Sequence, residues 1–267
     1  MVIEYSPQYG ISRACRVLRL VRSTVYVSTN RDDSEIEMAL AIKAEAHPRE
    51  GFWKAHHRLR LEGRPWNHKR THRVYVEMGL NIRKKRKKRL PGRIETPLEI
   101  PAHPTHSWSI DFMHDRLANG RKVRCFNVID DFNREALFVE IDTSLKSQNV
   151  IWVLNHLVKR LGKPAQIRVD NGPEFIAHAT RDWSLGHGID LKYIQPGSPT
   201  QNAYIERYNG SFRRGVLDAY SFNTLQEVRD VAQKWIYDYN HNRPHKSLGN
   251  IPPVQHRINY EMKTRLN

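Results

Sequence analysis

Cysteine, long apolar runs and acidic residues are all scarce in this sequence, and each shortage excludes a class of protein. The two cysteines among 267 residues, Cys15 and Cys125, cannot form a disulfide framework or a cysteine zinc cluster. No apolar run reaches the roughly 18 residues of a membrane span, and Glu4 and Arg13 interrupt the region where a secretory signal would lie. We therefore expect a protein of the reducing cytoplasm that does not enter a membrane.

Acidic residues are outnumbered by basic ones. The sequence holds 44 Lys and Arg against 28 Asp and Glu, which gives a formal net charge of +16 and a pI of about 10.0. The hydrophobic fraction of 39% is ordinary for a globular protein, so bulk disorder does not explain the charge. A polyanionic partner is the simplest explanation of the excess.

The basic residues are concentrated in the first 100 positions, which hold 22 of them against 11 acidic residues. Seven occur in succession, namely Arg83, Lys84, Lys85, Arg86, Lys87, Lys88 and Arg89. Because prolines follow up to Pro104, we predict that residues 83–104 form a basic linker that holds DNA phosphates without reading base sequence. A solvated charge run with no specific partner is an alternative that the run alone leaves open.

Residues 1–82 have the pattern of a small helical domain. We expect short helices over residues 11–18, 23–27, 33–46, 52–61 and 69–80. The first two are close enough for a helix-turn-helix, a motif that places its second helix in the major groove of DNA. We therefore predict an all-helical, helix-turn-helix-like DNA-binding region.

From residue 105 onward the pattern changes to strands alternating with helices. Strands are expected over 107–112, 123–129, 136–141, 165–169 and 189–194, and helices over 148–161, 173–187 and 201–217. Three strands in a row followed by alternating elements indicate an α/β fold, with a mixed five-stranded sheet flanked by helices. We expect this catalytic domain to extend over 105–267 and to end in a helical tail.

Three acidic residues fall at positions where such a fold can gather them. Asp111 lies on the first strand, Asp170 ends the fourth, and Glu206 lies within the last predicted helix. Three clustered carboxylates repel one another unless cations neutralise them, so the cluster predicts a divalent metal site, and oxygen ligands favour Mg²⁺ or Mn²⁺. Four other acids compete for these roles, namely Asp115, Asp130, Asp131 and Glu174.

The helical face of Glu206 separates it from its competitors. Spacings of 4, 3 and 4 place one polar stripe on the predicted helix, made of Asn202, Glu206, Asn209 and Arg213. The same spacings give a neighbouring apolar stripe, made of Ile205, Tyr208, Phe212 and Val216. We expect the apolar stripe to pack against the sheet and the polar one to face a ligand.

Two longer segments resemble a known family. Residues 167–175 read IRVDNGPEF and residues 194–210 read IQPGSPTQNAYIERYNG, with 35 residues between Asp170 and Glu206. Both are similar to the catalytic core of DDE transposases with a retroviral-integrase-like fold. The motif around Arg243-Pro244-His245 resembles the C-terminal signature of bacterial insertion-sequence transposases, in particular the second reading-frame product of their two-frame family.

The resemblance implies an RNase H-like core in which Asp111, Asp170 and Glu206 bind two Mg²⁺ ions, with Mn²⁺ as a substitute. It implies cleavage and transfer of DNA strands at terminal inverted repeats, with double-stranded element and target DNA as partners. It also implies a homo-oligomer on DNA, an upstream reading-frame product as partner or fusion, and action at the bacterial nucleoid. Arg213, Asn202 and Asn209 are the expected DNA contacts near the metals.

Two other functions remain as hypotheses. The basic helical half suits a non-catalytic DNA-binding regulator, which would bind element ends without Glu206. Another RNase H-like nuclease, acting on junctions or RNA–DNA hybrids, would use the same three acids, although the Arg-Pro-His signature argues against it.

Overall fold

The computed structural model describes residues 10–22, 32–82, 101–195 and 199–266. The predicted helix at 23–27 and the basic run from Arg83 to Arg89 lie outside these described residues. The N-terminal helices are α2 (Ile11–Val17), α3 (Ser34–Ala46), α4 (Phe52–Leu61) and α5 (His68–Glu77). The strands are β1 (Ser107–Arg116), β2 (Lys122–Asp130), β3 (Ala136–Asp142), β4 (Gln166–Val169) and β5 (Asp190–Tyr193).

The remaining helices lie between and after the strands. They are α6 (Ser147–Leu161), α7 (Pro173–Ile176), α8 (His178–His187), α9 (Ala203–Phe212), α10 (Leu225–His241) and α11 (Pro253–Leu266). Two short 3₁₀ turns, η2 (Pro199–Asn202) and η4 (Lys246–Leu248), and one π-helical turn, η3 (Arg213–Leu217), complete the described elements. None of the described helices is long and apolar enough to span a lipid bilayer.

The chain divides into two compact units. The smaller unit comprises Met1–Pro48 and Trp66–Asn81, and the larger unit comprises Arg49–Pro65 and Ile82–Asn267. Helix α4 therefore belongs with the sheet, whereas the sequence grouped it with the other N-terminal helices. The predicted domain boundary between residues 82 and 105 stays a prediction. In the smaller unit, Asp33 at the start of α3 forms ion pairs with Arg70 and Arg73 of α5.

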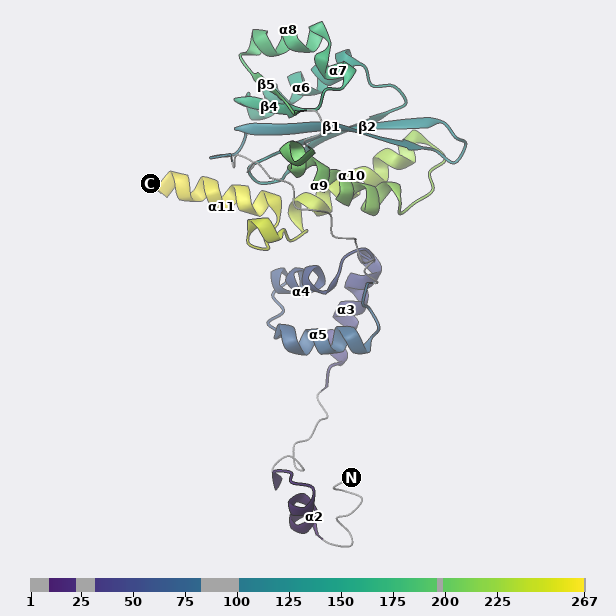
Figure 1. Ribbon diagram of the computed structural model, residues 1–267, viewed down its shortest axis with the longest axis vertical. Helices are drawn as coiled ribbons and strands as arrows, with labels where there is room; N and C mark the ends of the chain where they lie inside the picture. The colour runs from purple at the N-terminus through teal and green to yellow at the C-terminus, as the bar shows by residue number, and fades with distance from the viewer. Residues whose placement is uncertain (1–9, 23–31, 83–100, 196–198, 267) are drawn as a thin grey trace. The chain divides into compact units, whose positions relative to one another are not determined.

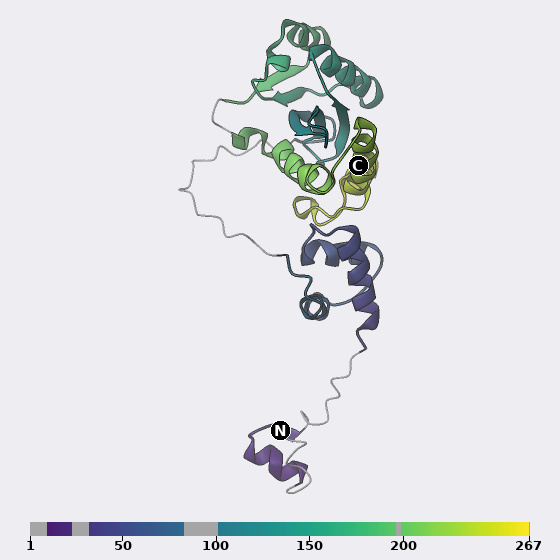
Figure 2. The same ribbon diagram turned by 90° about the vertical axis from the view of Figure 1, so that its right-hand side faces the viewer.

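A mixed five-stranded sheet forms the centre of the larger unit, as predicted. Its strand order is β3-β2-β1-β4-β5, with antiparallel pairing among the first three strands and parallel pairing of β1 with β4 and of β4 with β5. Helices cover both sides of this sheet, α6 to α8 on one and α9 and α10 on the other (Figures 1 and 2).

Alternation along the strands creates a separate core on each face. On β1, Trp108 and Ile110 point toward the face covered by α6, whereas Met113 points toward the face covered by α9. The α9 face buries Ile205, Tyr208, Phe212 and Val216 at 0–1% exposure, which confirms the predicted apolar stripe. Odd-numbered positions of β1 thus lie on the same face of the sheet as α9.

Two predicted helices are interrupted. The helix expected over 173–187 breaks between α7 and α8 at Ala177, whose extended backbone (φ −52°, ψ 138°) cannot continue a helix. The helix expected over 201–217 starts as the 3₁₀ turn η2 and ends as the π-helical turn η3. A side chain at Gly215 in η3 would collide with the indole of Trp235, so glycine permits close packing against α10 there.

A buried ion network ties α4 to α10 within the larger unit. The Arg58 guanidinium donates to Glu50 at 2.8 Å and to both carboxylate oxygens of Asp238 at 2.9 and 2.7 Å. Glu50 also pairs with Arg243 at 3.0 Å. The Arg58 and Glu50 side chains are only 4% and 8% exposed, so these charges depend on one another for the solvation that water no longer supplies.

Candidate active site

Strand register brings the first two candidate acids together. In the parallel pair of β1 and β4, Ser109 lies opposite Arg168. Asp111 follows Ser109 by two residues and Asp170 follows Arg168 by two, so both acids project from neighbouring positions on the face covered by α9. This side-by-side placement follows from the pairing register, which the sequence pattern did not specify.

Hydrogen bonds fix the orientation of Asp111. Its Oδ1 accepts from the backbone N–H of Phe112 at 2.8 Å, and its Oδ2 accepts from Nδ2 of Asn209 on α9 at 2.7 Å. The Oδ1 of Asn209 in turn accepts from Nδ2 of Asn127 on β2 at 2.7 Å. Asn209 and Asn127 are buried, so a chain of two amides connects β2 through α9 to this carboxylate.

Asp170 is held by the turn that follows β4. Its Oδ1 accepts from the backbone N–H of Gly172 at 2.9 Å. A Cβ added at residue 172 would lie 2.9 Å from that same oxygen and 3.4 Å from a ring carbon of Phe175. Glycine at this position therefore permits the close approach of the turn to the carboxylate.

Glu206 on α9 is the third candidate acid. Its negative charge and that of Asp170 both act on the carboxyl of Asp111. Burial raises the pKa of Asp111 to about 6, and the negative charges of Asp170 and Glu206 act in the same direction. The hydrogen bonds from Phe112 and Asn209 oppose this shift. Glu206 is exposed, but partial burial still raises its pKa. Mutual repulsion of this kind is what a bound cation relieves.

The donor chemistry of these acids fits a hard divalent cation. Carboxylate oxygens from three separate elements are the ligands that Mg²⁺ and Mn²⁺ prefer, and no sulfur or imidazole is needed. Among the described residues, no three His, Cys, Asp or Glu side chains are close enough together to hold a single ion. The three acids therefore offer suitable oxygen ligands, but in this structure their side chains lie too far apart to surround one ion.

A cavity of about 840 Å³ lies beside Asp111 and Asp170. Its wall includes the basic side chains of Arg116, Lys122 and Arg124. The Arg124 guanidinium stacks over the ring of Phe112 at 4.2 Å and pairs with Glu174 at 2.7 Å. Four carboxylates, those of Asp111, Asp115, Asp170 and Glu174, line the cavity beside these three cations, so its charge is mixed. A bound metal cation would shift this balance toward binding of a polyanion.

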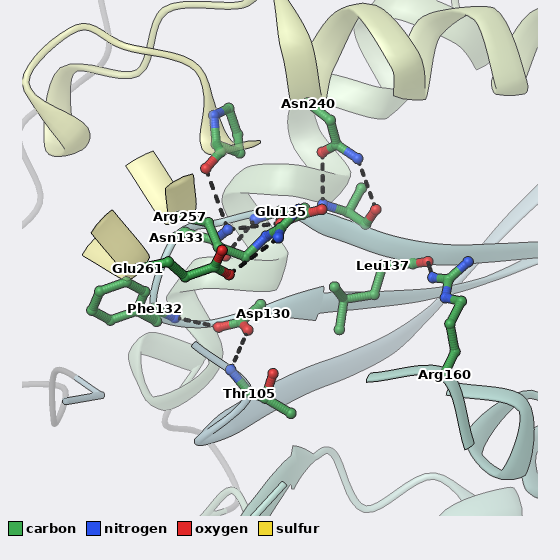
Figure 3. Close-up of polar contacts among 12 residues, drawn as sticks. Thr105, Asp130, Phe132, Asn133, Glu135, Leu137, Arg160, Asn240, Arg257 and Glu261 are labelled. Atoms are coloured by element: carbon green, nitrogen blue, oxygen red, sulfur yellow. Dashed lines mark hydrogen bonds and ion pairs between the residues drawn. The ribbon is translucent and has the colours of Figure 1, made fainter. Parts of the chain in front are cut away.

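Three of the competing acids have structural partners. Asp130 accepts from the backbone N–H groups of Thr105 and Phe132 at 2.6 and 2.8 Å, within the hydrogen-bond network around the β2–β3 turn (Figure 3). Asp131 is fully buried and accepts from the hydroxyls of Ser107 and Ser109. Glu174 is held by Arg124, whose hydrogen bond keeps its pKa low in spite of burial. These three carboxylates stabilise the fold around the site.

The predicted DNA contacts have different surroundings. Arg213 is partly exposed, donates to the backbone carbonyl of His114 at 2.9 Å and lies 4.0 Å from Asp115. Asn202 is 4% exposed, and its Oδ1 has no hydrogen-bond partner among the described residues. Asn209 is also buried and contacts Asp111 directly, which places it behind the carboxylate. The three DNA-binding roles stay predictions.

Sequence reasoning did not single out Asn127, Gly172 or Arg124. Asn127 had a recognisable signal, because an amide between Phe126 and Val128 in an apolar strand needs a buried partner. Gly172 lies within the IRVDNGPEF segment, but its role depends on the shape of the turn. The position of Arg124 in the cavity wall depends on the pairing of β1 with β2, which composition does not reveal.

Comparison with known proteins places this site in a family. A model described as "Integrase core domain" matches residues 101–199, and a second model with the same description matches residues 187–253. The "Insertion element IS407 uncharacterized 31.7 kDa protein" of Burkholderia multivorans is 39% identical over 245 residues, 91% of this chain and 88% of that protein. The "Insertion element IS476 uncharacterized 39.2 kDa protein" of Xanthomonas euvesicatoria is 38% identical over 269 residues, 100% of this chain and 77% of that protein.

The fold has a solved counterpart. A chain of the simian T-cell lymphotropic virus intasome, determined in complex with PP2A regulatory subunit B56 gamma, superposes with a TM-score of 0.53. The alignment covers 82% of this chain and 74% of that one at 18% identity, so it shows a common fold alone. The sheet order and the helices on its two faces are therefore those of an integrase-like core.

Proposed function

The chain belongs to the insertion-sequence DDE transposases with an integrase core, and from this premise we propose that it cleaves and transfers DNA strands at the terminal inverted repeats of an insertion sequence. The observation that carries the proposal is the register of β1 and β4, which places Asp111 and Asp170 side by side at a cavity whose wall also carries three basic side chains. Neighbouring acids with basic side chains in the same cavity wall suit phosphoryl transfer on a polyanion.

Asp111, Asp170 and Glu206 would hold two Mg²⁺ ions, with Mn²⁺ as a substitute. When bound, the ions activate the attacking oxygen and stabilise the leaving oxygen of an in-line phosphoryl transfer. Asn209 and the Gly172 N–H hold two of the three carboxylates in fixed orientations. A positioned ligand set loses less conformational freedom when it becomes ordered around the substrate.

The basic residues of the cavity wall would bind the DNA backbone beside these acids. Lys122 and Arg116 contribute positive charge along β1 and β2, and Arg213 lies on α9's polar stripe. We propose double-stranded element ends and target DNA as the substrates, a homo-oligomer on DNA as the active form and the upstream reading-frame product as a partner. Action would take place in the bacterial cytoplasm, at the nucleoid.

A cleavage assay tests this function. Purified full-length protein is mixed with a labelled duplex carrying an inverted repeat of the element, with Mg²⁺, with Mn²⁺ or with a chelator. We expect a nick that leaves a 3′ hydroxyl with either metal and no nick with the chelator. The Glu206→Gln protein should bind the duplex and not nick it. Equal nicking by Glu206→Gln, or nicking in the chelator, contradicts the proposal, and end binding alone would favour the non-catalytic regulator.

Gly172→Ala tests whether the turn positions Asp170. The added methyl group would displace the Asp170 carboxylate, because Oδ1 lies 2.9 Å from the position of the new Cβ. A displacement of a catalytic ligand by up to about 1 Å lowers rates by about 10- to 100-fold, so we expect slower nicking with little change in thermal stability. Gly186→Ala is the matched control, because a Cβ there has open space within 4 Å. Equal rates for the two variants would show that the turn does not position Asp170.

A further inference from the structure

The larger unit contains a second cavity, which the acids do not line. It has a volume of about 470 Å³ and is bounded by α4, α9, the β2–β3 turn and the loop around η4. Six cationic side chains line it, from Lys54, Arg134, Arg207, Arg214, Arg243 and Lys246. Among the described lining residues there is no Asp or Glu. Among the described residues, the ion pair of Arg243 with Glu50 neutralises one of these six positive charges.

Helix α9 and the turn η3 that follows it both contribute to this cavity. Arg207 and Ser211 lie four residues apart on α9, and Arg214 follows in η3. Arg207 and Arg214 are exposed, so the interior packing does not require them. Glu206 and Asn209 do not line this cavity, so the segment of α9 and η3 carries a carboxylate for the first site and two guanidinium groups for the second cavity.

Buried polar atoms without partners also border the cavity. Tyr208 is 1% exposed, and its hydroxyl has no hydrogen-bond partner among the described residues. Nη1 of Arg134 and Nε2 of His245, two half-buried residues that line the cavity as well, are also buried atoms without a partner among the described residues. A buried polar atom left unsatisfied costs about 1–3 kcal/mol, so three at one cavity favour a polar ligand there.

The backbone conformation of Arg134 is a further sign that its side chain has a role at this cavity. Its φ of 64° lies in the left-handed region, which few residues other than glycine adopt. The conformation sets the guanidinium 3.5 Å above the ring of Tyr204, at the cavity wall. Strain of this kind is retained where the surrounding structure makes use of the side chain.

The charges at the cavity repel one another. Burial lowers the pKa of Lys54 to about 8, and the charges of Arg243, Arg58 and Arg214 lower it further while Glu50 opposes them. Burial and the neighbouring cations also lower the pKa of His245 to about 3, which leaves its imidazole neutral. An anion in the cavity would relieve this repulsion.

We propose that this cavity binds a phosphodiester of the DNA backbone at a position separate from the carboxylate site, through Arg207 of α9, Arg214 of η3, Arg134 and the Tyr208 hydroxyl. The inference rests on the proposed function only in taking DNA as the partner. Guanidinium and hydroxyl groups donate the hydrogen bonds that phosphate oxygens accept. Arg243 and His245 of the Arg243-Pro244-His245 motif line the cavity. From the sequence alone, this motif was recognised only as a family signature.

A binding assay without metal tests the proposal. Fluorescence anisotropy measures the affinity of the full chain for a labelled duplex of about 30 base pairs in a chelator, over a range of salt concentrations. For Arg207→Gln and for Arg214→Gln we expect about fivefold weaker binding near 0.1 M salt, and a salt slope smaller by about 1. Lys159→Gln removes the same charge from an exposed position on α6 and should bind like the wild type. Equal weakening in all three variants would overturn the proposal, because general charge would then explain the binding.

Tyr208→Phe separates binding from folding. Since the hydroxyl has no hydrogen-bond partner in the part of the chain that the structure describes, its removal should leave the melting temperature unchanged or higher. We expect it to weaken duplex binding severalfold. Unchanged binding by a folded Tyr208→Phe protein would show that the hydroxyl does not contact phosphate and would contradict the proposal.

Failure of this inference can be told from failure of the proposed function. If the cavity variants bind normally while the wild type nicks DNA and Glu206→Gln does not, the cavity proposal alone is wrong. If the cavity variants bind weakly but the wild type never nicks DNA, the cavity proposal holds and the catalytic proposal is wrong.

Discussion

Asp111→Asn should lower strand cleavage by about 10³-fold or more, the largest effect that we expect from one substitution in the larger unit. The change removes a negative charge and one ligand oxygen from the acids that would hold the metal ions, and metal stabilisation of the transition state is worth several kcal/mol. The amide keeps the shape of the side chain, so DNA binding in a chelator should remain close to that of the wild type. Substantial cleavage by this variant would remove Asp111 from the active site.

The same substitution should change how stability depends on pH. Burial raises the pKa of Asp111 in the folded protein to about 6, from its ordinary value of 3.8. A raised pKa contributes stability that is fully present below the unfolded value and is lost as pH rises through the folded value. Between pH 4 and 7, the metal-free wild type should therefore lose about 1–2 kcal/mol of unfolding free energy that the variant retains, after allowance for partial solvent screening.

Chemical denaturation in a chelator at several pH values measures this difference. Asp182→Asn is a suitable control, because it makes the same chemical change at an exposed position on α8. Asp130, whose pKa burial also raises to about 6, contributes equally to all three proteins and cancels in the comparison. Parallel curves for the wild type and Asp111→Asn would show that Asp111 titrates normally.

Arg58→Met should lower the unfolding free energy of the larger unit by about 3–5 kcal/mol. The methionine fills most of the volume but leaves Glu50 and Asp238 without the guanidinium that donates hydrogen bonds of 2.7–2.9 Å to them. Arg58 holds the pKa of Glu50 low against the effect of burial, so its loss leaves a buried carboxylate with weaker compensation. Such a cost is a large share of the 5–15 kcal/mol that a typical domain has.

Denaturation monitored by tryptophan fluorescence and by circular dichroism would measure the loss. The control is Asp190→Asn, which breaks a 2.6 Å pair with Lys192 whose side chains are both 57% exposed. An exposed pair of this kind contributes about 0–1 kcal/mol, so the control should be nearly as stable as the wild type. A similar small effect for Arg58→Met would mean that α4 contributes little to the stability of the larger unit.

The sequence was sufficient for features that depend on local pattern. Alternation predicted the five strands, and helical spacing predicted that Ile205 and Phe212 would pack inside while Glu206 would not. The mixed sheet followed from the order of the elements, and the places of Asp111, Asp170 and Glu206 on these elements made them candidates, to which the resemblance to transposases added. All of these depend on neighbours within a few residues or on motifs that are continuous in the chain.

Features that depend on contacts between distant segments were not predictable. Helix α4 belongs to the unit that contains the sheet, where Arg58 donates a hydrogen bond to Asp238, 180 residues later in the chain. The second cavity gathers Lys54, Arg134 and Arg207 from three separate segments, and none of these residues stands out in the sequence among its many basic neighbours. The break between α7 and α8 at Ala177 likewise could not be predicted, because no glycine or proline lies at its centre.

The short β4 strand links the placement of Asp170 to the stability of the larger unit. Only four residues pair it with its neighbours, and Ile167 and Val169 fill the core beneath α6, so Arg168 and Asp170 lie on the opposite face of the sheet. A slip of one residue would exchange these faces, burying an arginine and an aspartate in an apolar layer. A register that moved Asp170 away from Asp111 would therefore also destabilise the larger unit.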